Sequence, residues 1–152
     1  DIIAIFFAEA PFSFKLFNWR VGITIAELKD QAIETPFPTA EFHLLSPRSY
    51  IFAHTSFYDG DAGQIDIYAF DGERANYPTH VATLELPKLL PNVYVTNLII
   101  QAAPFCAQAI SGTPFSKSND SRIYMVLICY GTTPVKWYRL FVHYRCFHKY
   151  ML

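Results

Sequence analysis

The chain has 152 residues, of which 52% are hydrophobic and only 16% are charged, a composition that excludes an intrinsically disordered protein. Its formal net charge of -1 gives no basic footprint, which argues against binding to nucleic acid or to an anionic membrane. No apolar run reaches the roughly 18 residues that a membrane-spanning helix needs, since Asn97, Gln101 and Gly131 interrupt the best candidates. We therefore expect one water-soluble domain with a substantial core.

The sequence begins with Asp1 inside an apolar run, without the basic leader of a secretory signal, which indicates a piece of a longer protein. The three cysteines, Cys106, Cys129 and Cys146, are an odd number and form no C-x-x-C pair. Neither a disulfide framework nor a thiolate zinc site is therefore indicated. Reduced thiols favour an intracellular location, in the cytoplasm or the nucleus.

Short runs of β-prone residues follow one another along the chain, with no convincing amphipathic helix between them. In chain order they are IIAIFF (2–7), FKLF (14–17), ITIAEL (23–28), EFHLL (41–45), SYIFAH (49–54), IDIY (65–68), HVATLEL (80–86), VYVTNLIIQ (93–101), RIYMVLICY (122–130) and YRLF (138–141). The runs FKLF, IDIY and YRLF share one pattern of large apolar, charged, aliphatic and aromatic residues, and each follows an apolar strand. This self-similarity predicts three hairpins in a repeat of about 50 to 70 residues.

A four-stranded antiparallel unit that recurs with such a period is typical of a β-propeller blade. The strand around FKLF carries large side chains on both faces, as a strand between two neighbouring blades requires, with Trp19 and Phe70 supplying bulk between the sheets. We predict an all-β fold, a partial β-propeller of antiparallel four-stranded blades, about two and a half to three in number and not closed. A single β-sandwich, in which one face of each sheet is dry, is the alternative.

The predicted organisation is the end of a first blade in 1–40, a second blade in 41–92 and a third, partial blade in 93–152, all in one incomplete propeller domain. A propeller needs at least about four blades to close. The end blades should therefore expose apolar faces, which the remainder of the parent propeller would cover.

Several longer runs allow a comparison with known families: GQIDIYAFDG (63–72), PTHVATLELPKLLPNV (78–93), APF (103–105), TPFSKSNDSRIYMV (113–126) and RLFVHYRCFHKYM (139–151). Together with FNWRVG (17–22), they resemble the C-terminal regions of F-box-domain proteins of mushroom-type fungi. The resemblance implies a propeller-like region that recruits substrates, joined in that family to an N-terminal F-box that docks onto a cullin-type ubiquitin ligase. No F-box-like helical segment is found in this sequence, so ligase docking is not assigned to its residues.

Two clusters contain residue types that bind metal ions. In HYRCFH (143–148), strand alternation would turn the first histidine away from the cysteine and the last histidine, leaving two ligands where structural zinc needs four. Asp59, Asp61 and Asp66 lie in a glycine-rich turn that weakly resembles a calcium loop, but the third alternating carboxylate and the closing glutamate are missing. We expect no metal and no cofactor.

Catalytic motifs find little support in the sequence. G-x-S-x-G and G-x-x-x-x-G-K are absent, and Ser111 has no identifiable histidine partner. Rim carboxylates such as Asp59, Asp61 and Glu73, the last near Asp71, could serve a carbohydrate-binding or carbohydrate-active propeller. That function is the alternative to our leading hypothesis, a non-enzymatic module that binds a protein partner.

The loop at 101–121 is the predicted contact with that partner, because it is long where the equivalent connection of the second blade is short. It contains Phe105, Phe115 and Lys117, and Arg122 follows at its end. Aromatic residues and arginine are enriched at interface hot spots. In the alternative interpretation, both phenylalanines pack against the flank of the blade in a compact, self-packed loop.

Overall fold

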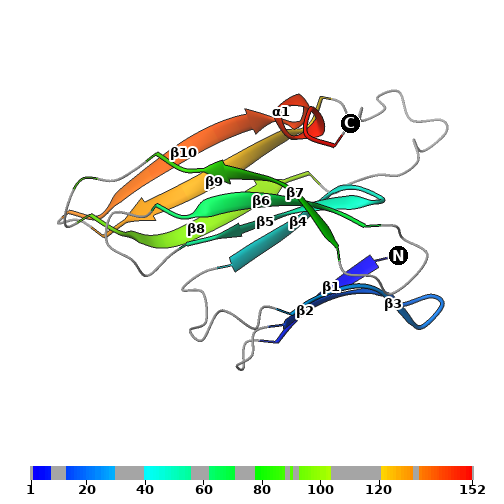
Figure 1. The fold of residues 1–152 in the computed structure, drawn as a ribbon. Coiled ribbons are helices and arrows are strands. Elements are labelled where there is room, and N and C mark those ends of the chain that lie inside the picture. Colours follow the sequence, from blue (N-terminus) through cyan, green and yellow to red (C-terminus); the bar gives the residue numbers. More distant parts are fainter. Residues whose placement is uncertain are drawn as a thin grey trace.

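The computed structural model describes residues 2–7, 13–29, 40–55, 62–70, 78–87, 90, 93–103, 121–131 and 134–151. Within these ranges the chain forms ten strands and one short helix (Figure 1). They are β1 (Ile2–Phe7), β2 (Ser13–Asn18), β3 (Ile23–Lys29), β4 (Ala40–Ser46), β5 (Ser49–His54), β6 (Gln64–Ala69), β7 (Thr79–Glu85), β8 (Val95–Ala102), β9 (Ile123–Tyr130), β10 (Lys136–His143) and α1 (Tyr144–His148). The ten strand runs expected from IIAIFF to YRLF are all present, with small shifts of their ends.

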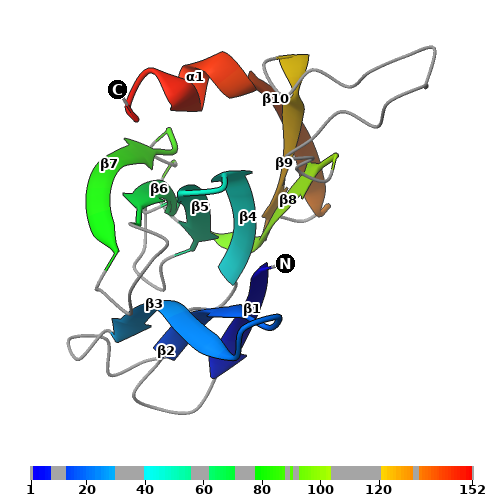
Figure 2. The ribbon, with the colours of Figure 1, turned by 90° about the vertical axis from the view of Figure 1, so that its right-hand side faces the viewer.

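The strands form three antiparallel sheets in the orders β1-β2-β3, β4-β5-β6-β7 and β10-β9-β8, which we call the first, second and third sheet. Each sheet contains only strands that follow one another in the chain, as in propeller blades. Figure 2 shows the three sheets side by side around an open arc, with the second sheet in the middle. The fold is thus all-β, a partial propeller that does not close. Among the described strands, only the second sheet has the predicted four, and the other two sheets have three each.

The second sheet is covered on both faces, which explains the nearly continuous apolar sequence of β5. Tyr50 and Phe52 point toward the first sheet and belong to one core cluster, with Leu16 and Phe70. The alternate residues of β5 belong to a second, larger cluster, with side chains of the third sheet. A strand that is buried on both faces has no side exposed to solvent, so its sequence does not alternate between apolar and polar residues.

The first sheet lies at an end of the arc and is covered on one face. Leu16 of β2 is fully buried, whereas Trp19 follows the strand in a turn and is 57% exposed. The prediction that Trp19 supplies bulk between sheets is therefore wrong, because the end of the strand lies outside the contact with the second sheet. Phe70, its expected counterpart, is buried in that contact.

The segment HYRCFH was expected to be a strand, and this prediction is wrong. It forms α1, with His143 as the N-cap, whose Nδ1 accepts a hydrogen bond from the Arg145 backbone N–H. Tyr144 and Phe147 are three residues apart, so a helix turns both into the core, where Phe147 makes a T-shaped contact with Tyr124. The helix extends from the end of β10 toward the second sheet and contacts β4 (Figure 2). Strand alternation therefore does not apply to the histidines and the cysteine of this segment.

Within the described ranges, no helix combines the length and apolar character needed to cross a membrane.

Candidate functional site

Arg122 is the one predicted partner-binding residue that the structure describes; Phe105, Phe115 and Lys117 lie outside the described residues. Arg122 is 7% exposed. Its Nη2 donates to the carbonyl oxygen of Leu45 at 2.6 Å and its Nη1 to that of Leu44 at 3.4 Å. The structure thus places Arg122 between the second and third sheets, and not on the surface where the sequence analysis expected it.

Further polar contacts hold β4 against the third sheet. The guanidinium carbon of Arg122 lies 5.2 Å from the ring centroid of Tyr124, whose hydroxyl donates to Leu44 at 3.4 Å. On β4, His43 Nε2 lies 2.7 Å from the carbonyl oxygen of Ile100. Because a carbonyl oxygen only accepts hydrogen bonds, Nε2 carries the hydrogen. Burial lowers the pKa of His43, and the Arg122 charge lowers it further, while the bond to Ile100 opposes the shift. We call these contacts the β4 seam.

The β4 seam fixes the base of the long predicted loop. The chain enters this segment from Ala102, which packs against the larger core cluster, and leaves it at Arg122. Both ends are therefore attached to well-packed parts of the second and third sheets.

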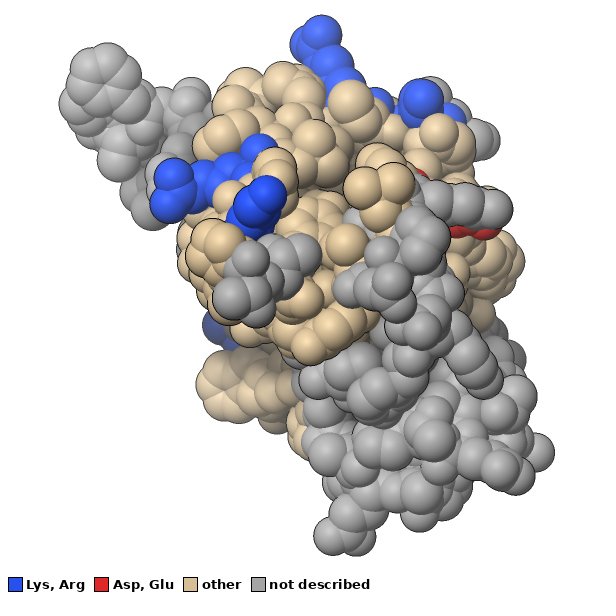
Figure 3. Space-filling model, turned by 90° about the vertical axis from the view of Figure 1, so that its left-hand side faces the viewer, with Lys and Arg blue, Asp and Glu red and all other residues tan. Residues whose placement is uncertain are grey.

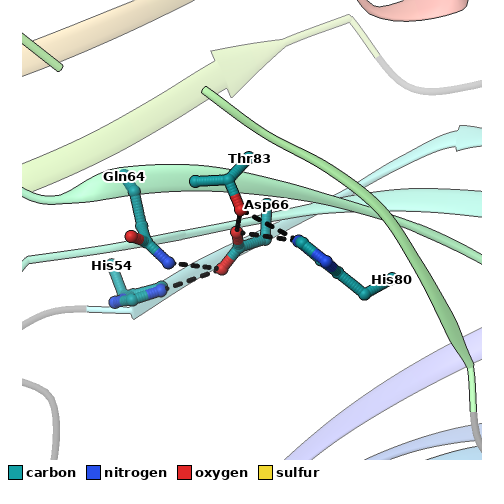
Figure 4. A network of polar contacts seen from close by, with 5 residues as sticks. All are labelled: His54, Gln64, Asp66, His80 and Thr83. Carbon is teal, nitrogen blue, oxygen red and sulfur yellow. Dashed lines mark hydrogen bonds and ion pairs between the residues drawn. The ribbon is translucent and has the colours of Figure 1, made fainter. Parts of the chain in front are cut away.

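Asp66 lies at the centre of a polar cluster that sequence reasoning did not identify (Figure 4). It is 5% exposed and lies on the face of the second sheet that is turned toward the first. At Oδ1, Asp66 accepts from Thr83 Oγ1 at 2.6 Å and from His80 Nε2 at 3.2 Å. At Oδ2 it accepts from His54 Nε2 and from Gln64 Nε2, both at 3.0 Å. The cluster ties β5, β6 and β7 together.

The four donors determine the charge of Asp66. Burial alone would raise its pKa, but the hydrogen bonds from His54, Thr83 and Gln64 outweigh burial and lower the pKa to about 2. The carboxylate is therefore ionised at neutral pH, and each oxygen is bonded to two protein donors. These four bonds leave no oxygen of Asp66 open for a calcium ion. Asp59 and Asp61, the other residues of the calcium alternative, lie outside the described ranges.

The hydrogen-bond directions also define what the cluster can do chemically. Thr83 Oγ1 donates its only proton to Asp66. His80 Nε2 lies 2.9 Å from Thr83 Oγ1, and because that proton is already used, the nitrogen donates to the hydroxyl oxygen and does not accept from it. A nucleophile needs the reverse arrangement, in which the base accepts the hydroxyl proton. The cluster in this form is a cross-strand tie. Its signal in the sequence was an aspartate within the apolar strand IDIY, with histidines on both neighbouring strands.

The carboxylates of the carbohydrate alternative, Asp59, Asp61, Asp71 and Glu73, all lie outside the described residues. Asp59 and Asp61 belong to the connection between β5 and β6, whereas Glu73 belongs to that between β6 and β7. Because the three strands are consecutive and antiparallel, these connections start at opposite ends of β6. Six strand residues span about 20 Å, so the two connections do not begin from a common rim.

Large apolar side chains are exposed at both ends of the arc, as the sequence analysis expected for end blades. On the first sheet and its β2–β3 turn they are Ile3, Ile5, Trp19, Val21 and Ile23, and on the third sheet they include Ile123, Trp137, Tyr138, Leu140 and Phe141. In Figure 3, basic side chains stand among uncharged surface at the end of the molecule where β9 turns into β10. Exposed apolar surface bordered by charge is typical of interaction sites.

Comparisons with protein-family models, with curated proteins and with solved structures find no match for this chain. In the part of the chain that the structure describes, no group of three or more His, Cys, Asp or Glu side chains could hold a metal ion. The arrangement of the described side chains therefore carries the assignment of function.

Proposed function

We propose that this protein is a non-catalytic interaction module, part of a β-propeller, that binds a protein partner. In this proposal it acts as the substrate-recruiting region of a fungal F-box ubiquitin-ligase receptor does, in the cytoplasm or the nucleus. An exposed free thiol at Cys146 is compatible with such a reducing compartment.

The observation that carries the proposal is the exposed aromatic and apolar surface of β10. Trp137, Tyr138, Leu140 and Phe141 are 44% to 64% exposed, and Arg139 is exposed among them. Aromatic residues and arginine are the types that dominate binding energy in protein interfaces. Leaving them in water is unfavourable, and a partner that covers them gains the free energy of their burial.

The predicted loop is the second element of this proposal. Its base is held by the β4 seam, and Phe105, Phe115 and Lys117 are the residues that we propose to contact the partner. Phe115→Ala tests this role, because a structural phenylalanine and a contacting one give opposite results. A contacting Phe115 leaves the free energy of unfolding unchanged and reduces partner capture, whereas a buried one costs about 3 kcal/mol.

Partner capture is measured by affinity purification from an extract of a mushroom-forming fungus, with quantitative mass spectrometry of wild type and Phe115→Ala in parallel. The proposal expects a protein that the wild type enriches and the variant does not. Binding in a glycan array, with no protein enriched, would instead establish the carbohydrate alternative.

A further inference from the structure

β10 is an edge strand at a position that an interior strand holds in the second sheet. It pairs with β9, and among the described strands nothing pairs with its other side. In the second sheet, β6 holds the equivalent third place, and β7 pairs with its other side. Every side chain from Lys136 to Phe141 is exposed, whereas Ile65, Asp66 and Ile67 of β6 are buried. A strand added beside β10 would complete a four-stranded blade.

The repeated pattern FKLF, IDIY and YRLF has a charged residue at its second position. The first and second sheets show which kind of residue the outermost strand places opposite that charged residue. In the first sheet this position is Lys15, and Glu27 of the outer strand β3 lies directly opposite, with Nζ and Oε1 3.2 Å apart. In the second sheet it is Asp66, and Thr83 of the outer strand β7 lies directly opposite and donates to it. In both sheets the outermost strand supplies a polar group that matches the charge.

The third copy of the pattern is YRLF, and its charged residue is Arg139. Arg139 alternates with Leu140, whose register partner Val126 belongs to the core between the second and third sheets. Arg139 therefore lies on the face turned away from the second sheet. Lys15 also lies on an outer face, next to the buried Leu16, so the pair of Lys15 with Glu27 is the closer precedent. By that precedent, a carboxylate belongs opposite Arg139.

The charge of the surrounding segment points the same way. Residues 136–149 contain Lys136, Arg139, Arg145 and Lys149 and no Asp or Glu, in a protein whose formal net charge is -1. Trp137 and Phe141 lie two residues on either side of Arg139 and share its face. A complementary strand therefore has an acidic residue in the middle, with apolar residues two positions before and after it.

We propose that β10 binds an extended segment of a protein partner as a fourth antiparallel strand, with a carboxylate opposite Arg139 and apolar side chains against Trp137 and Phe141. The inference rests on the proposed interaction function and names the chemistry of one partner segment. Main-chain hydrogen bonds to the open edge supply affinity, and the side chains opposite β10 supply specificity.

The test uses fluorescence anisotropy with two labelled nonapeptides, one with the core Val-Thr-Glu-Thr-Val and one with Lys in place of Glu. The wild-type chain should bind the Glu peptide about fivefold to tenfold more tightly, since the exchange replaces an attraction by a repulsion. Arg139→Glu should reverse this preference. Arg48→Glu, in the exposed β4–β5 turn, is the matched control and should leave both affinities unchanged.

Two further measurements separate strand addition from other modes of binding. N-methylation of the peptide amides that would face β10 should abolish binding, and hydrogen exchange should show new protection of β10 amides that do not bond to β9.

Equal affinity for both peptides, or undiminished binding of the N-methylated peptide, would overturn the proposal. So would a homodimer in light scattering that the peptide does not dissociate, because a second copy would then cover β10. If Phe115→Ala abolishes partner capture and no peptide binds, the proposed function stands and only this inference is wrong.

Discussion

Nη2 of Arg122 lies 2.6 Å from the carbonyl oxygen of Leu45, a residue 77 positions earlier in the chain. This bond links β4, an edge strand of the second sheet, to the third sheet. Without it, a carbonyl oxygen of β4 would lose its charged donor at the buried contact between the two sheets, where an unsatisfied carbonyl is costly.

Replacing Arg122 by Met keeps most of the side-chain volume and removes the two guanidinium hydrogen bonds to Leu44 and Leu45, while the Tyr124 hydroxyl still donates to Leu44. We expect Arg122→Met to lower the free energy of unfolding by about 2 to 3 kcal/mol, because the hydrogen bonds are charge-assisted and buried. Urea titration followed by tryptophan fluorescence measures the change. Arg48→Met, at an exposed arginine, should stay within about 0.5 kcal/mol; equal effects of the two substitutions would contradict a special role for the β4 seam.

The Asp66 cluster predicts acid sensitivity. The pKa of Asp66 is about 2 in the folded protein and 3.8 ordinarily. As the pH falls, the unfolded chain is protonated first, so the stabilisation from Asp66 is complete above about pH 4 and is lost between about pH 4 and pH 2. The loss corresponds to about 2 kcal/mol.

Asp66→Asn tests this linkage, because the amide cannot ionise. The variant should be less stable than the wild type by about 2 kcal/mol at about pH 6, and the difference should shrink toward about pH 2. Urea midpoints measured across this range give the comparison, with Glu85→Gln on the exposed surface of β7 as the control. A difference between wild type and Asp66→Asn that does not change with pH would show that the carboxylate charge is not the stabilising feature.

Two glycines have positive φ, and only one of them also lacks space for a Cβ atom, so substitutions at the two sites distinguish backbone strain from steric overlap. Gly22 has φ +69° with nothing within 4 Å of an added Cβ, whereas at Gly63, with φ +89°, a Cβ would overlap the carbonyl oxygen of His54 and lie 2.8 Å from Thr55 Cα. Gly22→Ala should cost about 1 kcal/mol, from strain alone. Gly63→Ala should cost more than about 3 kcal/mol, because backbone atoms must also move. Thermal unfolding by circular dichroism measures both, and similar losses at the two sites would refute the predicted overlap.

The position of α1 predicts a contrast between two phenylalanines. Phe147 is 0% exposed and packs on Tyr124, whereas Phe141 is 64% exposed on β10. Phe147→Ala should lower the free energy of unfolding by about 3 to 5 kcal/mol, through lost burial and the cavity left behind. Phe141→Ala should change it by less than about 0.5 kcal/mol. Guanidinium titration of both variants measures the free energy of unfolding. A loss of less than about 1 kcal/mol for Phe147→Ala would mean that α1 rests on the surface of the core and is not part of it.

The sequence by itself determined the strands and their grouping into three sheets. Alternation, turn residues and the recurrence of FKLF, IDIY and YRLF are local properties of the chain, and each sheet contains only consecutive strands. Local signals are sufficient for such a topology, because every hairpin pairs segments that are close in sequence. They also predicted the exposed apolar faces at the ends of the arc, since sheets with nothing stacked beyond them leave one face in water.

Only the tertiary structure decided which of these faces and charges are buried. Trp19 and Phe70 were expected to act alike, but one lies past the end of a strand in an end sheet and the other between two sheets. Arg122 looked like a surface residue at the end of a loop until the carbonyl groups of β4, almost eighty residues earlier, were placed beside it. The donors of Asp66 come from three strands, and α1 forms where the core accepts two aromatic rings three residues apart. The burial of Arg122, of Phe70 and of the two rings of α1 depends on contacts between different sheets, and no local pattern of residues encodes such contacts. The Asp66 cluster joins neighbouring hairpin strands, and there the tertiary structure decided only which polar groups meet.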